Sequence, residues 1–132
     1  MIVLNGDSFF NVDVTELMEF HLSKNADISL SLKEMFDADR YGIIELENDR
    51  IINMREKEYA ARCYINGGVY VIKRDVFNSF SLPGRFSFEE FLTDNVGNLK
   101  IFGRHFDGSF IDIGIPDDYE AALTLIPDWV GL

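Results

Sequence analysis

The residues best placed to do chemistry are two aspartates that follow short apolar runs. Asp7 comes after Ile2–Leu4 and a glycine, and Asp112 lies among the apolar and small residues of Phe110–Gly114. Ligands of open α/β sheets bind beyond the carboxyl ends of the strands, where a carboxylate can hold a hard cation such as Mg²⁺. Each aspartate also has a plainer interpretation, Asp7 as a turn residue and Asp112 as the cap of a final helix.

A second group of residues could hold a sugar or a phosphate. Asn66-Gly67-Gly68 interrupts an apolar run, and paired glycines let a backbone come close to a ligand, although they suit a β-bulge equally well. Glu56-Lys57 offers an acceptor for sugar hydroxyls and a positive charge for a phosphate, or it belongs to a solvated loop. His21, His105 and Cys63 form no pattern typical of a catalytic triad or a thiol nucleophile, and we expect structural roles for His21 and Cys63.

The composition narrows the classes of partner. The chain has 132 residues, with 12 Lys plus Arg against 23 Asp plus Glu, a formal charge of −11. Such an acidic chain is a poor binder of nucleic acid or of an anionic membrane surface. No apolar run approaches the roughly 20 residues of a membrane helix. A single cysteine excludes an internal disulfide and indicates a reducing compartment, so we expect a cytoplasmic protein.

Local patterns predict the elements that position these residues. Asp13 with Glu16, and Ser87 with Glu90, have the spacing of capping boxes that open helices. Apolar and polar residues alternate from Ile28 to Lys33, as in a half-buried strand. The remaining predicted strands are 2–4, 42–47, 50–54, 64–72, 99–106 and 109–113, with a polar loop at 37–41, an irregular segment at 55–62, a short helix at 74–80 and a final helix from 116.

Two dipeptides indicate tight turns between strands. Asn48-Asp49 and Asp107-Gly108 both suit two-residue hairpins, and Asp107-Gly108 is the stronger signal. The order of elements favours an α/β fold with a parallel core and an antiparallel extension. The first apolar run begins almost at Met1, which predicts an edge strand or a strand that something else normally precedes.

Six segments carry a resemblance to a known family: Leu4–Phe9, Arg40–Gly42, Arg55–Lys57, Ile65–Tyr70, Phe86–Glu89 and Phe110–Pro116. Their residues and their order resemble the sugar-1-phosphate nucleotidyltransferases, or nucleotide-sugar pyrophosphorylases, over nearly the whole chain. Within that family the sequence is most similar to the D-glycero-D-manno-heptose 1-phosphate guanylyltransferases, and then to the mannose-1-phosphate guanylyltransferases.

The resemblance implies part of a Rossmann-like, GT-A-like fold, a mixed sheet with flanking helices. Domains of this family begin with a glycine-rich loop of the type G-G-x-G-T-R-L and a lysine-bearing segment, which bind the nucleotide phosphates. Neither pattern occurs in this sequence. Residues 1–132 are therefore expected to form one partial domain that lacks the N-terminal nucleotide-binding half.

The resemblance also implies roles for particular residues. Asp7 and Asp112 would hold Mg²⁺, and with Lys57, near the sugar phosphate, they would be the catalytic residues. The sugar-binding residues would be Gly42 through its amide, Glu56 through sugar hydroxyls, and the pocket residues Asn66, Gly67 and Glu89. The two glutamates differ in that Glu89 would order the pocket rather than contact the sugar hydroxyls.

The implied reaction joins a sugar 1-phosphate, heptose or mannose 1-phosphate, to an NTP with release of pyrophosphate, and the branch resemblance favours GTP. The alternative is a non-catalytic remnant that binds a nucleotide sugar or assembles with itself. An exposed first strand would present unpaired backbone and an apolar face, so a homo-oligomer is expected in either case.

Overall fold

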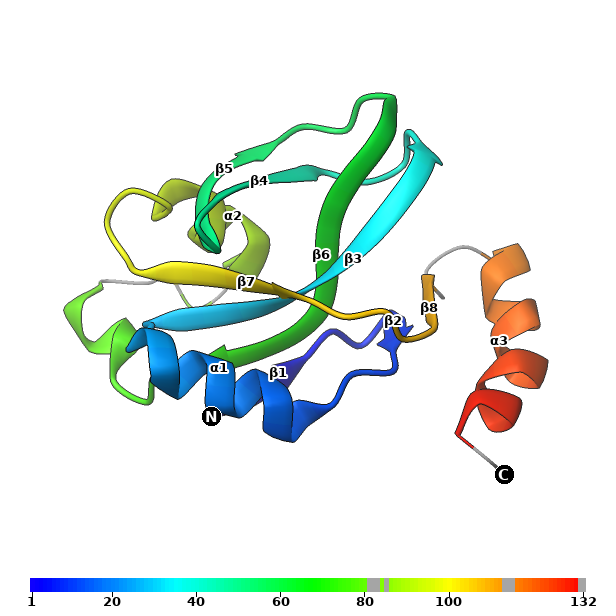
Figure 1. The fold of residues 1–132 in the computed structure, drawn as a ribbon, viewed down its shortest axis with the longest axis horizontal. Helices are drawn as coiled ribbons and strands as arrows, with labels where there is room; N and C mark the ends of the chain where they lie inside the picture. The colour runs from blue at the N-terminus through cyan, green and yellow to red at the C-terminus, as the bar shows by residue number, and fades with distance from the viewer. Residues whose placement is uncertain (81–83, 85, 113–115, 131–132) are drawn as a thin grey trace.

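The computed structural model of the chain describes residues 1–80, 84, 86–112 and 116–130 and contains two sheets (Figure 1). The large sheet has the strand order β1-β6-β3-β7-β5-β4, and a small sheet pairs β2 with β8. Helices flank the sheets, so the predicted mixed α/β fold is confirmed. The strands are β1 (Ile2–Leu4), β2 (Ser8–Phe10), β3 (Ile28–Ala38), β4 (Ile43–Glu47), β5 (Arg50–Arg55), β6 (Ala60–Ile72), β7 (Ile101–His105) and β8 (Phe110–Asp112); the helices are α1 (Val14–Lys24), the 3₁₀ turn η1 (Val76–Ser79), α2 (Phe88–Asp94) and α3 (Pro116–Trp129).

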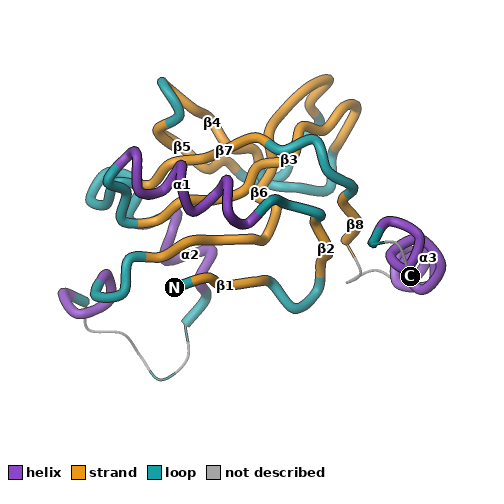
Figure 2. Tube along the Cα trace, turned by 60° about the horizontal axis from the view of Figure 1, so that its bottom comes forward, coloured by secondary structure: helices purple, strands orange, loops and turns teal. Residues whose placement is uncertain are grey.

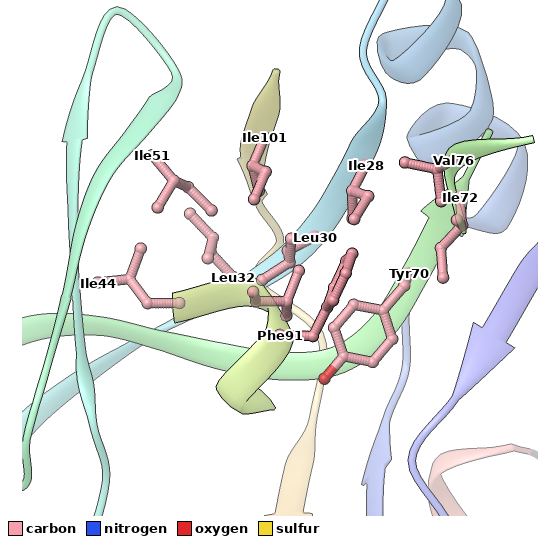
Figure 3. Close-up of a cluster of buried hydrophobic side chains, with 11 residues drawn as sticks. Ile28, Leu30, Leu32, Ile44, Ile51, Tyr70, Ile72, Val76, Phe91 and Ile101 are labelled. Atoms are coloured by element: carbon pink, nitrogen blue, oxygen red, sulfur yellow. The ribbon is translucent and has the colours of Figure 1, made fainter. Parts of the chain in front are cut away.

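The large sheet carries a separate core on each face, because side chains alternate along its central strands. On β6, Tyr70 and Ile72 join the cluster that packs with α2, whereas Val69 and Val71 join the cluster around α1. Figures 1 and 2 show α1 and α2 on opposite sides of this sheet. Figure 3 shows the first cluster, in which the side chains come from β3, β4, β5, β6, β7, η1 and α2.

Both predicted capping boxes form their N-cap bond. The Asp13 side chain accepts a hydrogen bond from the Glu16 amide at 3.1 Å, and Ser87 accepts one from the Glu90 amide at 3.3 Å. Each bond satisfies a backbone donor that the first turn of a helix leaves without a partner. α1 is followed by the C-cap residue Asn25, whose left-handed φ of 49° is typical of the end of a helix.

Residues 28–32 of β3 are buried on both faces, unlike the half-buried strand that the alternating pattern predicted. Ser29 and Ser31 are fully buried, and they face the α1 side rather than solvent. The Ser29 hydroxyl lies 2.8 Å from His21 Nδ1, and the Ser31 hydroxyl accepts a hydrogen bond from the Val69 amide at 3.2 Å. Each buried hydroxyl therefore has a partner, and His21 has the structural role expected of it.

Two predictions about strand pairing were wrong. Only β3 and β7 pair in parallel among the described strands, so the sheet has no parallel core. Asp107-Gly108 does not close a hairpin, because β7 pairs with β3 and β8 pairs with β2. The phenyl rings of Phe10, Phe106 and Phe110 pack edge to face around this junction, and that packing brings β8 across to β2.

The Asn48-Asp49 hairpin is confirmed. Both residues have positive φ, 50° and 67°, as a two-residue turn between right-twisted strands requires. Strands β3 and β6 are longer than predicted and pair from Ile28 with Ile72 to Ala38 with Ala60. The segments expected as a polar loop and as an irregular stretch therefore contribute residues to a long β-ribbon (Figure 1). The first strand, β1, lies at the edge of the large sheet. No described helix is long and apolar enough to cross a membrane.

Candidate functional site

A cleft of about 510 Å³ lies where the β4–β5 hairpin, strand β6 and helix α2 face one another. This volume is in the range of small-molecule sites. Apolar side chains of Ile43, Ile44 and Ile65 form part of its wall, and charged side chains of the 55–57 segment and of α2 surround them. Strand β8 adds one carboxylate, Asp112.

Six of the eight residues predicted for the site lie on this cleft, although they come from five separate parts of the chain. Gly42 precedes β4, Glu56 and Lys57 follow β5, Asn66 belongs to β6, Glu89 to α2 and Asp112 to β8. The other two, Asp7 and Gly67, are not among its lining residues.

Gly67 lies in a bulge of β6. Leu30 pairs with Tyr70 and Leu32 with Asn66, so three residues of β6 stand opposite Ser31 alone. A Cβ on Gly67 would overlap the Phe10 ring and lie 2.6 Å from the Ser31 hydroxyl. Close packing therefore explains the glycine at position 67, and the β-bulge interpretation of the glycine pair is confirmed.

The bulge also supports the segment that carries Asp7. Gly68 has a φ of 81°, and a Cβ there would lie 2.8 Å from the Ser8 hydroxyl and 2.9 Å from Asn5 Nδ2. The Asn5 amide donates a hydrogen bond to the Gly68 carbonyl at 2.8 Å. Residues 5–8 are thus held directly against the strand that supplies Asn66 to the cleft.

The small sheet brings the two aspartates into the same region. Ser8, the residue after Asp7, is the direct partner of Asp112 in the antiparallel β2–β8 pair. Asp7 is exposed, and its negative charge helps to raise the pKa of the Tyr70 hydroxyl, behind burial as the main cause. Among the described residues, no three His, Cys, Asp or Glu side chains gather in one place. Two carboxylates plus substrate phosphates and water are nevertheless a donor set that suits Mg²⁺.

The three cations of the cleft have different surroundings. Arg55 pairs with Glu45 at 2.8 Å and with Glu58 at 2.9 Å. The Arg40 guanidinium lies 5.3 Å from the centre of the Tyr41 ring and donates to its hydroxyl at 2.8 Å. Within the described residues, Lys57 has neither an ion pair nor a hydrogen bond and is exposed. Lys57 is therefore the cation most available to an anionic ligand.

Sequence patterns did not reveal two features of the site. The Tyr70 hydroxyl accepts a hydrogen bond from Asn66, whereas the sequence placed Tyr70 in a strand and in a resemblance segment without a role in the site. Helix α2 adds Glu90, Thr93 and Asp94 to Glu89 on the cleft wall, which makes that wall acidic. The i, i+4 spacing of Glu90 and Asp94 places them on one helix face and could have indicated this.

A protein-family profile described as "Nucleotidyl transferase" matches residues 1–127. The chain belongs to the nucleotidyl transferase family. The family resemblance inferred from the sequence segments is confirmed.

Individual relatives agree with this assignment. The chain is 48% identical over 118 residues to a D-glycero-alpha-D-manno-heptose 1-phosphate guanylyltransferase of Campylobacter jejuni, which covers 89% of the chain and 52% of that protein. It is 42% identical over 123 residues to the protein of the same name from Aneurinibacillus thermoaerophilus, with 92% and 54% covered. The crystal structure of HddC from Yersinia pseudotuberculosis superposes with a TM-score of 0.79 at 29% identity, covering 92% of the chain and 53% of that structure. The chain spans about half the length of these relatives.

Proposed function

We propose that this chain supplies the sugar-phosphate end of a guanylyltransferase active site. In the proposed reaction, an oxygen of a sugar 1-phosphate attacks the α-phosphorus of GTP and forms a new P–O bond. The bond to the β-phosphate oxygen breaks, and pyrophosphate leaves with the bonding electron pair. The observation that carries this proposal is the convergence of Gly42, Glu56, Lys57, Asn66, Glu89 and Asp112 on one cleft.

The proposed roles follow from the chemistry of each group. Lys57 contacts the sugar phosphate, because its ammonium is exposed and has no partner among the described residues. Glu56 accepts hydrogen bonds from sugar hydroxyls, and Asn66 can both donate and accept. Gly42 lets the sugar approach the backbone, and Gly67 shapes the bulge beside Asn66. Glu89 lies on the α2 wall and orders the pocket. Positioning and charge neutralisation are sufficient for such a transfer, which needs no protein nucleophile.

Asp7 and Asp112 are the residues we propose to hold Mg²⁺. Nucleotidyl transferases generally use a divalent metal. Bound Mg²⁺ would offset negative charge on the phosphates during the in-line displacement. Asp7 follows β1 and Asp112 ends β8, and the β2–β8 pairing keeps both strand ends at the same edge. The Asp7 and Asp112 carboxylates are therefore proposed as a pair.

The substrate identities rest on relatives. The two guanylyltransferases above are named for heptose 1-phosphate, and a putative mannose-1-phosphate guanyltransferase from Sulfolobus acidocaldarius is 30% identical over 121 residues. HddC from Yersinia pseudotuberculosis was crystallised with GMP-PN. We therefore propose GTP with heptose 1-phosphate or mannose 1-phosphate. We also propose a cytoplasmic site of action, because a single cysteine suits a reducing compartment.

The length of the relatives favours an alternative function, in which this chain binds a nucleotide sugar but is not catalytic by itself. Because the chain spans about half of them, we propose that residues 1–132 are a partial domain, with the glycine-rich nucleotide-binding part outside this sequence. Such a part-domain could bind a nucleotide sugar without transferring a nucleotidyl group. Binding of GDP-mannose without any pyrophosphate release would favour this alternative.

A pyrophosphate-release assay tests the proposal. The chain is supplied with Mg²⁺, GTP and mannose 1-phosphate or heptose 1-phosphate, and Asp7→Asn, Asp112→Asn and Asp107→Asn are compared. Asp107 is the matched control, because its side chain is 96% exposed and lies outside the cleft. If residues 1–132 suffice for transfer, release requires the sugar phosphate and falls by roughly 100-fold or more in the first two variants only. Equal release by all three variants would contradict the proposed metal role.

A further inference from the structure

The hydroxyl of Tyr70 is a polar group at the edge of an otherwise apolar cluster. Tyr70 is fully buried, and its ring packs edge to face against Phe88 of α2 with centroids 4.9 Å apart. Figure 3 shows the ring among the aliphatic side chains of β3 and β6, with the hydroxyl as the only oxygen drawn. A buried hydroxyl is costly unless it is hydrogen-bonded, so its partners have to be accounted for.

One partner is the cleft residue Asn66. Its Nδ2 donates to the Tyr70 hydroxyl at 2.7 Å, while its Oδ1 accepts a hydrogen bond from the Gly68 amide at 2.9 Å. Both ends of the amide are engaged, which fixes its orientation. The second N–H of Nδ2 has no protein acceptor among the described residues, and it is free for a ligand in the cleft.

The other partner belongs to the segment that carries Asp7. The Tyr70 hydroxyl donates to Asn5 Oδ1 at 3.3 Å. The Asn5 backbone is bonded to Gly68 in turn, so Asn5 is held from two sides. Asp7 lies two residues further along this short segment, before β2 begins.

We propose that the Tyr70 hydroxyl is a positioning group that sets the geometry of Asn66 and of the Asp7 segment together. This inference rests on the proposed function. It means that one hydroxyl holds both a proposed sugar-binding residue, Asn66, and the segment with a proposed metal ligand, Asp7. Tyr70 itself does not line the cleft. Its effect on a ligand has to pass through Asn66 or through Asn5.

A first test needs no ligand. The exchange of the Asn66 side-chain amide hydrogens with solvent is measured by NMR in the wild type, in Tyr70→Phe and in Tyr59→Phe. Tyr59 is the matched control, because its hydroxyl also donates to a side chain, Asp37 at 2.7 Å, but is exposed and outside the cleft. We expect exchange to rise about fivefold or more in Tyr70→Phe only, as loss of one hydrogen bond implies. An unchanged exchange rate of the Asn66 side-chain amide hydrogens in Tyr70→Phe would overturn the proposal.

A second test asks whether Tyr70 acts through Asn66. Binding of mannose 1-phosphate in the presence of Mg²⁺ is titrated for Tyr70→Phe, Asn66→Ala and the double variant. We expect each single variant to bind about five- to tenfold more weakly, and the double variant no more weakly than Asn66→Ala. Additive losses would overturn the proposed route through Asn66.

The segment with Asp7 provides an independent variant in case Tyr70→Phe folds poorly. Asn5→Ala removes the acceptor of the Tyr70 hydroxyl and leaves the aromatic core intact. We expect it to raise the Mg²⁺ concentration needed for half-maximal binding of mannose 1-phosphate severalfold, and an unchanged Mg²⁺ requirement would overturn the link to Asp7. If the wild type binds no mannose 1-phosphate while the exchange test succeeds, the proposed function fails and the hydrogen-bond network stands.

Discussion

At the scale of single residues, the cleft contains one lysine that has neither an ion pair nor a hydrogen bond within the described residues. Arg55 is neutralised by two glutamates and Arg40 lies over a tyrosine ring, whereas Lys57 is free within the described residues. Three acidic side chains of α2 face the same cleft. A dianionic phosphate would therefore depend strongly on Lys57 and on a divalent metal.

Lys57→Ala is expected to weaken binding of mannose 1-phosphate by about 10- to 100-fold, the usual value of a charge-assisted hydrogen bond. Isothermal titration in the presence of Mg²⁺ measures this. Lys73→Ala is the control, because Lys73 is also exposed but does not line the cleft. Equal losses of affinity in both variants would mean that binding depends on the net charge of the protein and not on a contact with Lys57.

Tyr70 gives the fold a pH dependence at high pH. Burial raises the pKa of Tyr70 to about 12, above its ordinary value of 10.0. The unfolded chain loses this proton first, so the stabilisation is complete below pH 10 and is lost as the pH rises toward 12. We expect the wild type to lose about 1 kcal/mol more than Tyr70→Phe between pH 9 and pH 11, measured by urea unfolding. Parallel pH profiles would contradict a buried, neutral Tyr70.

At the scale of elements, the bulge of β6 joins the two halves of the site. It turns Asn66 toward the cleft and offers Gly68 to the segment of residues 5–8. Gly67 has a different task, because its missing side chain leaves room for Phe10 of β2. The bulge therefore also determines where the small sheet lies.

Gly67→Ala is expected to destabilise the fold by about 1–3 kcal/mol, because the new methyl group would overlap the Phe10 ring. Gly97→Ala is the control, since nothing lies within 4 Å of a Cβ there, and its effect should stay within about 0.5 kcal/mol. Urea unfolding compares the two variants. A Gly67→Ala protein as stable as the control would show that β2 can shift freely.

Elements with local signals could be predicted from the sequence, and pairings between distant segments could not. The caps at Asp13 and Ser87 and the turn at Asn48-Asp49 depend on residues a few positions apart. The pairing of β8 with β2 joins residues about 100 positions apart and depends on phenylalanine packing. Asp107-Gly108 has the residue types of a hairpin turn, but contacts with distant residues pair β8 with β2 instead of with β7.

The same distinction applies to the site. Motif residues such as Asn66 and Glu56 could be named in advance because they occur in a recognisable order along the chain. Tyr70 could not, because its role depends on a hydroxyl that reaches two residues only in the folded state. The burial of Ser29 and Ser31 could not be predicted either. Polar residues on one face of β3 indicate exposure to solvent, but α1 covers that face in the folded chain.

At the scale of the whole molecule, strand β1 forms one edge of the large sheet and exposes apolar side chains. Ile2 is 43% exposed and Leu4 65% exposed. One side of β1 pairs with β6, and no described strand pairs with the other. Unpaired edges of this kind promote strand addition between chains. This supports the homo-oligomer that we propose for the chain.

Leu4→Lys is expected to shift the chain toward monomer at micromolar concentration, because a charge on an edge strand opposes pairing. Sedimentation velocity measures the distribution. Leu22→Lys carries the same charge change at a residue of α1 that is 70% exposed, and it should leave association unchanged. A wild type that is monomeric at these concentrations would contradict the proposed self-association.

The central claim is that the cleft holds a sugar 1-phosphate beside a metal bound by Asp7 and Asp112. The most direct test is a crystal structure of the chain with mannose 1-phosphate and Mn²⁺, whose anomalous scattering locates the ion. We expect Mn²⁺ about 2.0–2.3 Å from oxygens of both carboxylates, and the phosphate next to Lys57 Nζ. A metal bound away from either aspartate, or sugar phosphate density outside the cleft, would contradict the account.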